Sequence, residues 1–166
     1  MRVAELAAEW AERMGVPDSE RNRWLRAVWL HDALRDAPHE TLHEWASSSP
    51  VPGELRHGPA SAARAKADGE TDRGVLDAVR YHSLGLAEWD MVGRVLYCAD
   101  FLEPERGFEE RDRVELADRF PRDPRGVLRI VAASRLRHTI NSGWPLFEPS
   151  VRFWNSLVSA SGSPSR

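Results

Sequence analysis

Side chains that could bind a metal ion occur at four places along the 166-residue chain. They are the adjacent pair His31–Asp32, the single residues His57 and His82, and Asp100. Imidazole nitrogens and carboxylate oxygens are good ligands for divalent first-row metals. A carboxylate can also bridge two metal ions with its two oxygens, which an imidazole does not do. These residue types therefore favour a centre that holds divalent transition metals.

Each position also has a structural explanation, which the sequence leaves open. A lone histidine such as His57 often begins a helix and bonds only to backbone. The pair His31–Asp32 could be a buried polar pair, although burying an unpaired charge is costly and a metal ion would remove that cost. We interpret His39, His43 and His138, which lack such a context, as surface or structural residues.

All four positions fall at the ends of segments that are predicted to be helical. Apolar residues recur at intervals of three and four, as in amphipathic helices, and the alternation typical of a β-strand is lacking. The pattern predicts an all-α fold, with one helical domain over residues 1–158 and a disordered tail over residues 159–166. Helices are expected over residues 3–14, 18–32, 38–45, 59–68, 71–82, 91–103, 109–120, 124–142 and about 149–159.

Helix caps and core aromatic residues are assigned from the same pattern. Asp18 or Ser19 is expected to cap the second helix with a side-chain oxygen. Pro59 is expected at the first position of the fourth helix, where its missing N–H group is not needed. Trp24 and Trp29 recur at helical spacing before the His31–Asp32 pair and are predicted to be core residues.

Composition narrows the classes of partner. The chain has 23 basic and 26 acidic residues and a net charge of −3, so a nucleic-acid polymer is not favoured and an anionic substrate would need local arginines. Cys98 is the only cysteine, so no intrachain disulfide forms, which fits a reducing cytoplasm. No apolar stretch reaches the roughly 18 residues of a membrane span, and the first residues do not read as a signal peptide.

Four segments in a fixed order resemble a known family. They are WLHDALRDA, LRHGPASAARA, AVRYHSLG and VLYCADFLEPERGF, and they resemble the HD-domain metal-dependent phosphohydrolases. The resemblance is strongest to the YqeK-type branch, the symmetrical diadenosine tetraphosphate hydrolases. The C-terminal segment GWPLFEPSVRFWNSLV also resembles the end of that family, so the similarity covers essentially the whole chain.

The resemblance implies an all-helical HD domain with two divalent transition metals, usually iron, with manganese as the alternative. The implied ligands are His31, Asp32, His57, His82 and Asp100, with Asp32 as the bridge. The family splits diadenosine tetraphosphate in the middle into two ADP, and two metals suit this reaction because they activate water and neutralise charge on a phosphoryl group. The rival interpretations are an HD phosphohydrolase for another nucleotide, or a degenerate HD domain that binds nucleotide without turnover. A second copy of the chain, forming a homodimer, is a further possible partner.

Three arginines are candidates for binding substrate phosphates, because a guanidinium can grip phosphate oxygens in a bidentate way. Arg106 is the last residue of the EPER segment, and an ion pair with Glu103 is an equal alternative. Arg35 stands where the family usually has lysine, so the charge is kept but the contact can differ. Arg80 belongs to RYHS, and a structural role is favoured for it over phosphate binding. An adenine ring could also stack on Trp24 or Trp29, although the core interpretation comes first.

One family ligand has no counterpart in the chain. The family has a metal-binding histidine on its first helix, four residues before the valine that matches Val3, and this chain has no histidine before His31. Two explanations are kept: the coding sequence continues upstream of Met1 and supplies the histidine, or the ligand has been lost. We expect the first, because the other ligands are intact.

Overall fold

The computed structural model describes residues 2–103 and 110–159, and within them it contains α-helices, one 3-10 helix and no strand. This confirms the all-α prediction. The helices are α1 (Arg2–Arg13), α2 (Asp18–Leu30), α3 (His39–Ala46), η1 (Gly53–Arg56), α4 (His57–Ala67), α5 (Arg73–Tyr81), α6 (Met91–Leu102), α7 (Glu110–Arg119), α8 (Pro124–Asn141) and α9 (Glu148–Ser159).

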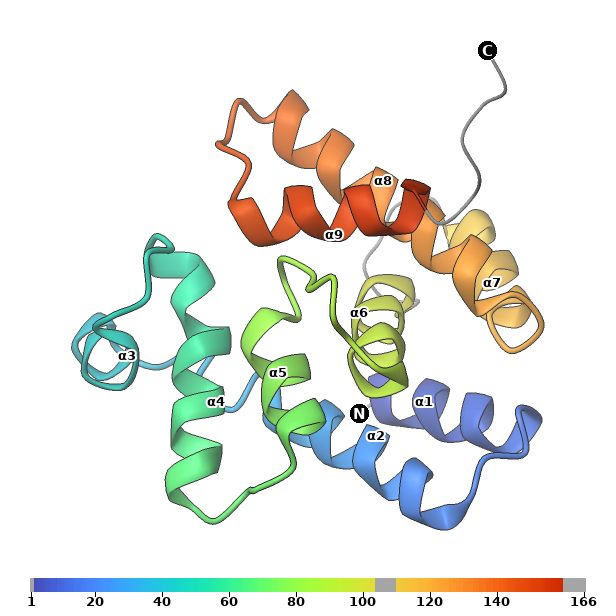
Figure 1. Cartoon of the computed structure of the whole chain (residues 1–166), viewed down its shortest axis with the longest axis horizontal. Helices are drawn as coiled ribbons and strands as arrows, with labels where there is room; N and C mark the ends of the chain where they lie inside the picture. The colour runs from blue at the N-terminus through green and yellow to red at the C-terminus, as the bar shows by residue number, and fades with distance from the viewer. Residues whose placement is uncertain (1, 104–109, 160–166) are drawn as a thin grey trace.

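Helix α6 forms the centre of the bundle and packs against α1, α2, α5, α7 and α8. It lies between the α1–α2 pair and the α8–α9 pair, with α5 beside it (Figure 1). Its sequence MVGRVLYCADFL is apolar on nearly every face, as expected of a helix enclosed by others. The burial of Val92, Val95 and Leu96, each 0% exposed, contributes about 1.5–3 kcal/mol per side chain.

The outer helices bring their ends to one side of this core. Helices α4 and α5 pack closely against each other, α2 packs against α5 and α6, and α3 covers α4. Leu42, Ala46 and Ala60 form a second, smaller apolar cluster between α3 and α4. The C-terminal ends of α2 and α5 and the start of α4 therefore meet beside α6, where the candidate ligands lie.

Some local predictions were wrong for identifiable reasons. Pro17 occupies the N-cap of α2 without a side-chain cap, so Asp18 is the first helical residue and neither Asp18 nor Ser19 caps the helix. Pro59 is the third residue of α4, because η1 runs directly into the helix. Trp24 is a core residue, but Trp29 is 65% exposed and lies outside the apolar face of α2.

The end of the chain differs slightly from the expected boundary. Ser159 is the last residue of α9, while residues 160–166 lie outside the part that the structure describes. The disordered tail therefore stays a prediction. Among the described residues, no helix combines the length and the apolar character that crossing a membrane requires.

Candidate metal centre

Four of the predicted ligand side chains converge between α2, α4 and α5. The Nε2 atoms of His57 and His82 lie 3.5 and 3.6 Å from the same oxygen of Asp32, Oδ1. His31 approaches from the end of α2, with its Nε2 atom 3.4 Å from the other carboxylate oxygen, Oδ2. The carboxylate of Asp32 therefore lies between the Nε2 atoms of His57 and His82 on one side and the Nε2 atom of His31 on the other.

The three histidine rings are oriented by the same type of hydrogen bond. In each, Nδ1 lies within hydrogen-bond distance of the backbone carbonyl three residues earlier, and a carbonyl can only accept. Nδ1 therefore carries the proton, which leaves the Nε2 lone pair free to point into the centre. His31 and His82 are the C-cap residues of α2 and α5, where carbonyls lack helical partners. The carbonyls are those of Val28, Glu54 and Val79, at 2.6, 2.7 and 2.8 Å.

The closest approach between atoms of two different candidate ligands is between two ring nitrogens. The Nε2 atoms of His57 and His82 are 3.0 Å apart. Because both Nδ1 protons already face carbonyls, two neutral rings would bring two lone pairs together, and a cation between them removes that repulsion. Gly58 permits the approach, since a Cβ atom there would lie 2.9 Å from the carbonyl oxygen of Arg80 and 3.2 Å from Cε1 of His82.

Burial and charge prepare these groups to bind a cation. His82 is 2% exposed, and burial lowers its pKa to about 4, so the ring is neutral at neutral pH. Burial works against ionisation of Asp32, but the neighbouring His31 and Arg35 hold the pKa of Asp32 below its usual value. Its Oδ1 atom is buried and has no hydrogen-bond partner.

These observations fit a divalent metal ion. Ligand atoms of Asp32, His57 and His82 all lie within 4.8 Å of one another. Two neutral nitrogens and one carboxylate oxygen form a donor set that suits a first-row transition metal, and the buried Oδ1 atom of Asp32 gains a partner when the ion binds.

Asp100 extends the centre on the side of α6. It is 5% exposed, and its Oδ1 atom lies 3.9 Å from Nε2 of His31. Its Oδ2 atom accepts a hydrogen bond of 2.9 Å from Arg135 on α8. Thus Asp100 and the Oδ2 side of Asp32 both face His31, opposite the pair formed by His57 and His82.

Arg135 is a residue of the site that the sequence interpretation missed. Its guanidinium lies over the rings of Tyr97 and Phe101, 4.5 and 5.3 Å from their centroids. Burial works against its charge, yet Asp100 holds the pKa of Arg135 above its usual value. The sequence did contain a signal that Arg135 is buried. Arg135 falls four residues after the buried Val131 and so continues the apolar face of α8.

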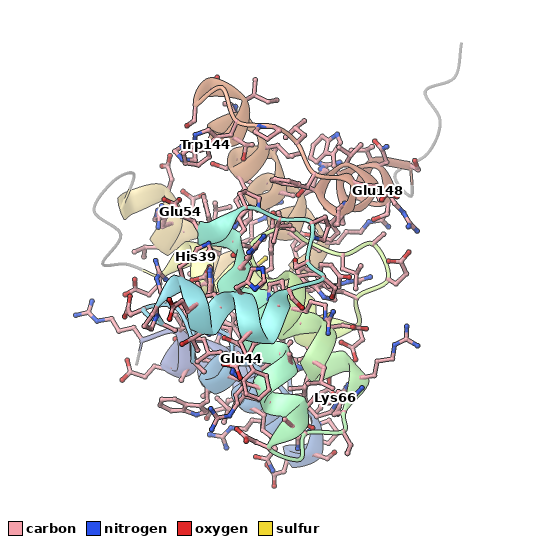
Figure 2. The ribbon with its side chains drawn as sticks, turned by 90° about the vertical axis from the view of Figure 1, so that its left-hand side faces the viewer. His39, Glu44, Glu54, Lys66, Trp144 and Glu148 are labelled. Atoms are coloured by element: carbon pink, nitrogen blue, oxygen red, sulfur yellow. The ribbon has the colours of Figure 1, made fainter. Side chains whose placement is uncertain are left out.

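A cleft of about 1240 Å³ passes beside the metal centre and extends to the loop between α8 and α9. The candidate ligands do not line the cleft themselves. It is lined by residues that contact them, namely Arg35 beside Asp32, Arg135 beside Asp100, and Glu54, whose carbonyl accepts from His57. At the other end it is lined by Trp144 and Phe147. Figure 2 shows Glu54 and Trp144 on the same face of the molecule, with Trp144 above Glu54. The cleft offers an elongated anionic ligand a path away from the metal centre.

The other residues that the sequence analysis singled out are not among the converging ligands. Arg35 donates a 2.7 Å hydrogen bond to Oδ2 of Asp32 and is half exposed, so it lies at the mouth of the centre. Arg80 is exposed, and the structure gives its side chain no partner among the described residues. Arg106 and the position before Met1 expected to carry a histidine lie outside the described residues. Cys98 is buried, and burial raises the pKa of its thiol.

The chain is similar in sequence to known proteins. The model of the HD domain family matches residues 1–141. The chain is 30% identical, over 96% of its length and 87% of the relative, to the symmetrical bis(5'-nucleosyl)-tetraphosphatase of Bacillus subtilis. It is 24% identical, over 63% of its length and 56% of the relative, to the enzyme of the same name from Halalkalibacterium halodurans.

A solved structure shows the same fold. The crystal structure of a predicted HD superfamily hydrolase involved in NAD metabolism, from Clostridium acetobutylicum, matches with a TM-score of 0.78. The two sequences are 23% identical, and the match covers 95% of this chain and 86% of the other. HD domain hydrolases bind divalent metals, and the converging Asp32, His57 and His82 form a possible metal site in this chain. The chain belongs to the HD domain family, in the branch of the symmetrical bis(5'-nucleosyl)-tetraphosphatases.

Proposed function

We propose that this chain is a metal-dependent phosphohydrolase that splits diadenosine tetraphosphate symmetrically into two ADP. The observation that carries the proposal is that the Nε2 atoms of His57 and His82 lie 3.5 and 3.6 Å from the buried, unpartnered Oδ1 atom of Asp32. The relatives whose name states this activity supply the substrate class. We further propose iron as the native metal, with manganese as a substitute, and the cytoplasm as the location. A homodimer stays a prediction.

The ligands divide into two groups around Asp32. Oδ1 of Asp32, His57 and His82 would hold one ion, while Oδ2 of Asp32, His31 and Asp100 would hold the second. Two bound ions supply an activated water nucleophile and neutralise charge on the transferring phosphoryl group. Because Asp32 belongs to both groups, its carboxylate would hold the two ions close to each other.

The arginines of the cleft would bind and orient the tetraphosphate. Arg35 lies at the mouth of the centre, where its partly exposed guanidinium can bind a phosphate oxygen while it contacts Asp32. Arg106 is proposed for the same task on the basis of the family resemblance. Arg135 is a positioning residue, since it holds Asp100 through a hydrogen bond and an ion pair.

The test is the product of the reaction. Purified protein loaded with Fe²⁺ without oxygen, or with Mn²⁺, should convert diadenosine tetraphosphate into ADP as the sole nucleotide product, as measured by chromatography. AMP plus ATP would refute symmetrical cleavage. Binding without any product from this substrate or from other nucleotides would favour a degenerate HD domain.

A matched pair of variants ties the activity to the proposed centre. His82→Gln removes a buried ring nitrogen from the centre, while His43→Gln changes an exposed histidine on α3. His82→Gln should lose nearly all activity, and His43→Gln should keep it. Equal activity in both variants would contradict the assignment.

A further inference from the structure

An exposed tryptophan lines the cleft at the loop between α8 and α9. Trp144 is 58% exposed and follows the C-terminus of α8. Its backbone is fixed by two hydrogen bonds of 3.0 Å. The N–H of Gly143 donates to the carbonyl of Ile140, and the N–H of Trp144 donates to the carbonyl of Thr139. With Gly143 at φ 69, this is the Schellman arrangement of a helix end. The position of Trp144 is therefore set by the backbone.

The indole is also held by one ring contact. His138 lies edge-to-face with Trp144, with centroids 5.7 Å apart and planes at 88°. This contact restrains the indole while more than half of the residue remains exposed. A large aromatic side chain that is already restrained loses little conformational entropy when a ligand covers it. Trp144 is thus prepared to bind a flat apolar group.

Positive charge connects this tryptophan to the metal centre. Arg135 contacts Asp100, and α8 continues from Arg135 to its C-cap Ser142, seven residues on, a rise of about 10 Å. Arg35, Arg135 and Arg137 all line the cleft. A polyphosphate lying against these arginines, with its cleaved bond at the metals, would carry its nucleoside toward Trp144.

We propose that Trp144 is the stacking platform for one purine base of the substrate. The proposal deepens the proposed function and rests on it, because it assumes that the cleaved phosphates lie at the metal centre. Stacking on an aromatic side chain needs only the face of the base, so it contributes affinity without hydrogen-bond recognition. Trp144 would therefore determine affinity for nucleosides over bare polyphosphates.

The other strongly exposed tryptophan lacks these surroundings. Trp29 is 65% exposed and lines a shallow depression of about 760 Å³ on another part of the surface. That depression is also lined by Asp68, Glu70 and Asp72. Its arginine, Arg26, is already paired with Glu70 and Asp72, at 3.0 and 3.4 Å. Because these carboxylates repel a polyphosphate, Trp29 provides a matched control.

The experiment separates the base from the phosphates. Calorimetry would measure the binding of ADP and of inorganic tripolyphosphate to Mn²⁺-loaded wild type, Trp144→Ala, Trp144→Phe and Trp29→Ala. Trp144→Ala should weaken ADP binding roughly 5- to 100-fold, the range expected from loss of one stacking contact. Tripolyphosphate binding should be unchanged, Trp144→Phe should recover most of the ADP affinity, and Trp29→Ala should match wild type.

Several results would overturn the proposal. They are equal ADP affinity in wild type and Trp144→Ala, equal weakening of ADP and tripolyphosphate, loss of ADP affinity in Trp29→Ala, or no ADP binding by wild type. Turnover of diadenosine tetraphosphate is measured in parallel. If wild type binds ADP through Trp144 but releases no ADP from this substrate, the proposed function fails while the stacking site stands.

Discussion

The metal centre and the α8–α9 end of the cleft hold their side chains by different means. In the centre, each histidine ring bonds to a carbonyl of its own segment, and His31 and His82 are buried. At the other end, Trp144 is fixed through its backbone and one ring contact, and its indole remains open to solvent. The first arrangement sets ligand atoms at fixed positions, whereas the second presents a surface. Substitutions should therefore have large effects on chemistry in the centre and graded effects on affinity at the far end.

The largest effect is expected from Asp32→Ala. This variant deletes the carboxylate shared by both groups of ligands, so bound metal should largely disappear and turnover should fall by at least about 100-fold. Metal analysis and product release measure the two effects. Asp36→Ala, at an exposed acidic residue four positions later, is the control and should resemble wild type. Equal metal content in Asp32→Ala and wild type would rule out a bridging carboxylate.

The next effect concerns the buried pair between α6 and α8. Arg135→Met removes the ion pair from Asp100, which is 5% exposed, and breaking a buried pair costs about 3 kcal/mol in unfolding free energy. Urea unfolding of the metal-free variant measures this loss. Arg129→Met, at an exposed position of the same helix, should cost less than about 0.5 kcal/mol. Equal stability of both variants would mean that Arg135 does not hold Asp100.

The two regions also differ in how far the sequence predicted them. His31, Asp32, His57 and His82 were identified because ligand chemistry restricts residue type and because helix ends limit where such side chains can point. Their convergence agrees with that prediction, although their roles as ligands stay a prediction. Arg135 was missed because its role depends on how α8 packs on α6, 35 residues away from Asp100.

Aromatic residues show the same limit. Helical spacing predicted Trp24 in the core correctly and Trp29 wrongly, because a position at the edge of the apolar face can turn to solvent. The cleft itself arises from the arrangement of η1, α6 and the α8–α9 loop, which no single segment encodes. The start of a helix was predicted wrongly where two elements merge, as with η1 and α4.

A smaller effect is expected far from both regions, where α5 begins. Asp72 accepts a hydrogen bond from the N–H of Val75 and two from Arg23 on α2, and the Arg23 bonds, the largest cause, lower its pKa to about 2. The unfolded chain therefore binds more protons between about pH 4 and 2, so Asp72 stabilises the fold above pH 4 and this stability is lost as pH falls toward 2. Because Asp72 is partly exposed, we expect about 1 kcal/mol.

Asp72→Asn tests this contribution while keeping a residue that can cap a helix. The variant should unfold about 1 kcal/mol more easily at pH 7, and its stability should change less than that of wild type between pH 4 and 2. Asp68→Asn, at a carboxylate that is 60% exposed, should follow the wild-type curve. Parallel acid-unfolding curves for Asp72→Asn and wild type would contradict the role of Asp72. Turnover at pH 7 should not change, since α5 keeps His82 in place.

The smallest effect is expected on ADP binding when the backbone turn at the end of α8 is changed. It tests whether this turn positions Trp144. Gly143 has φ 69, and a Cβ atom there would meet nothing within 4 Å, so Gly143→Ala adds only the backbone cost of a left-handed residue, about 1 kcal/mol. Gly15 is a close match, with φ 63, open space and the same pair of bonds at the end of α1. Both alanine variants should lose similar stability in urea. Only Gly143→Ala should weaken ADP binding, by a few-fold, because its turn carries the indole. If both variants bind ADP like wild type, the ring contact with His138, and not the turn, holds Trp144 in the cleft.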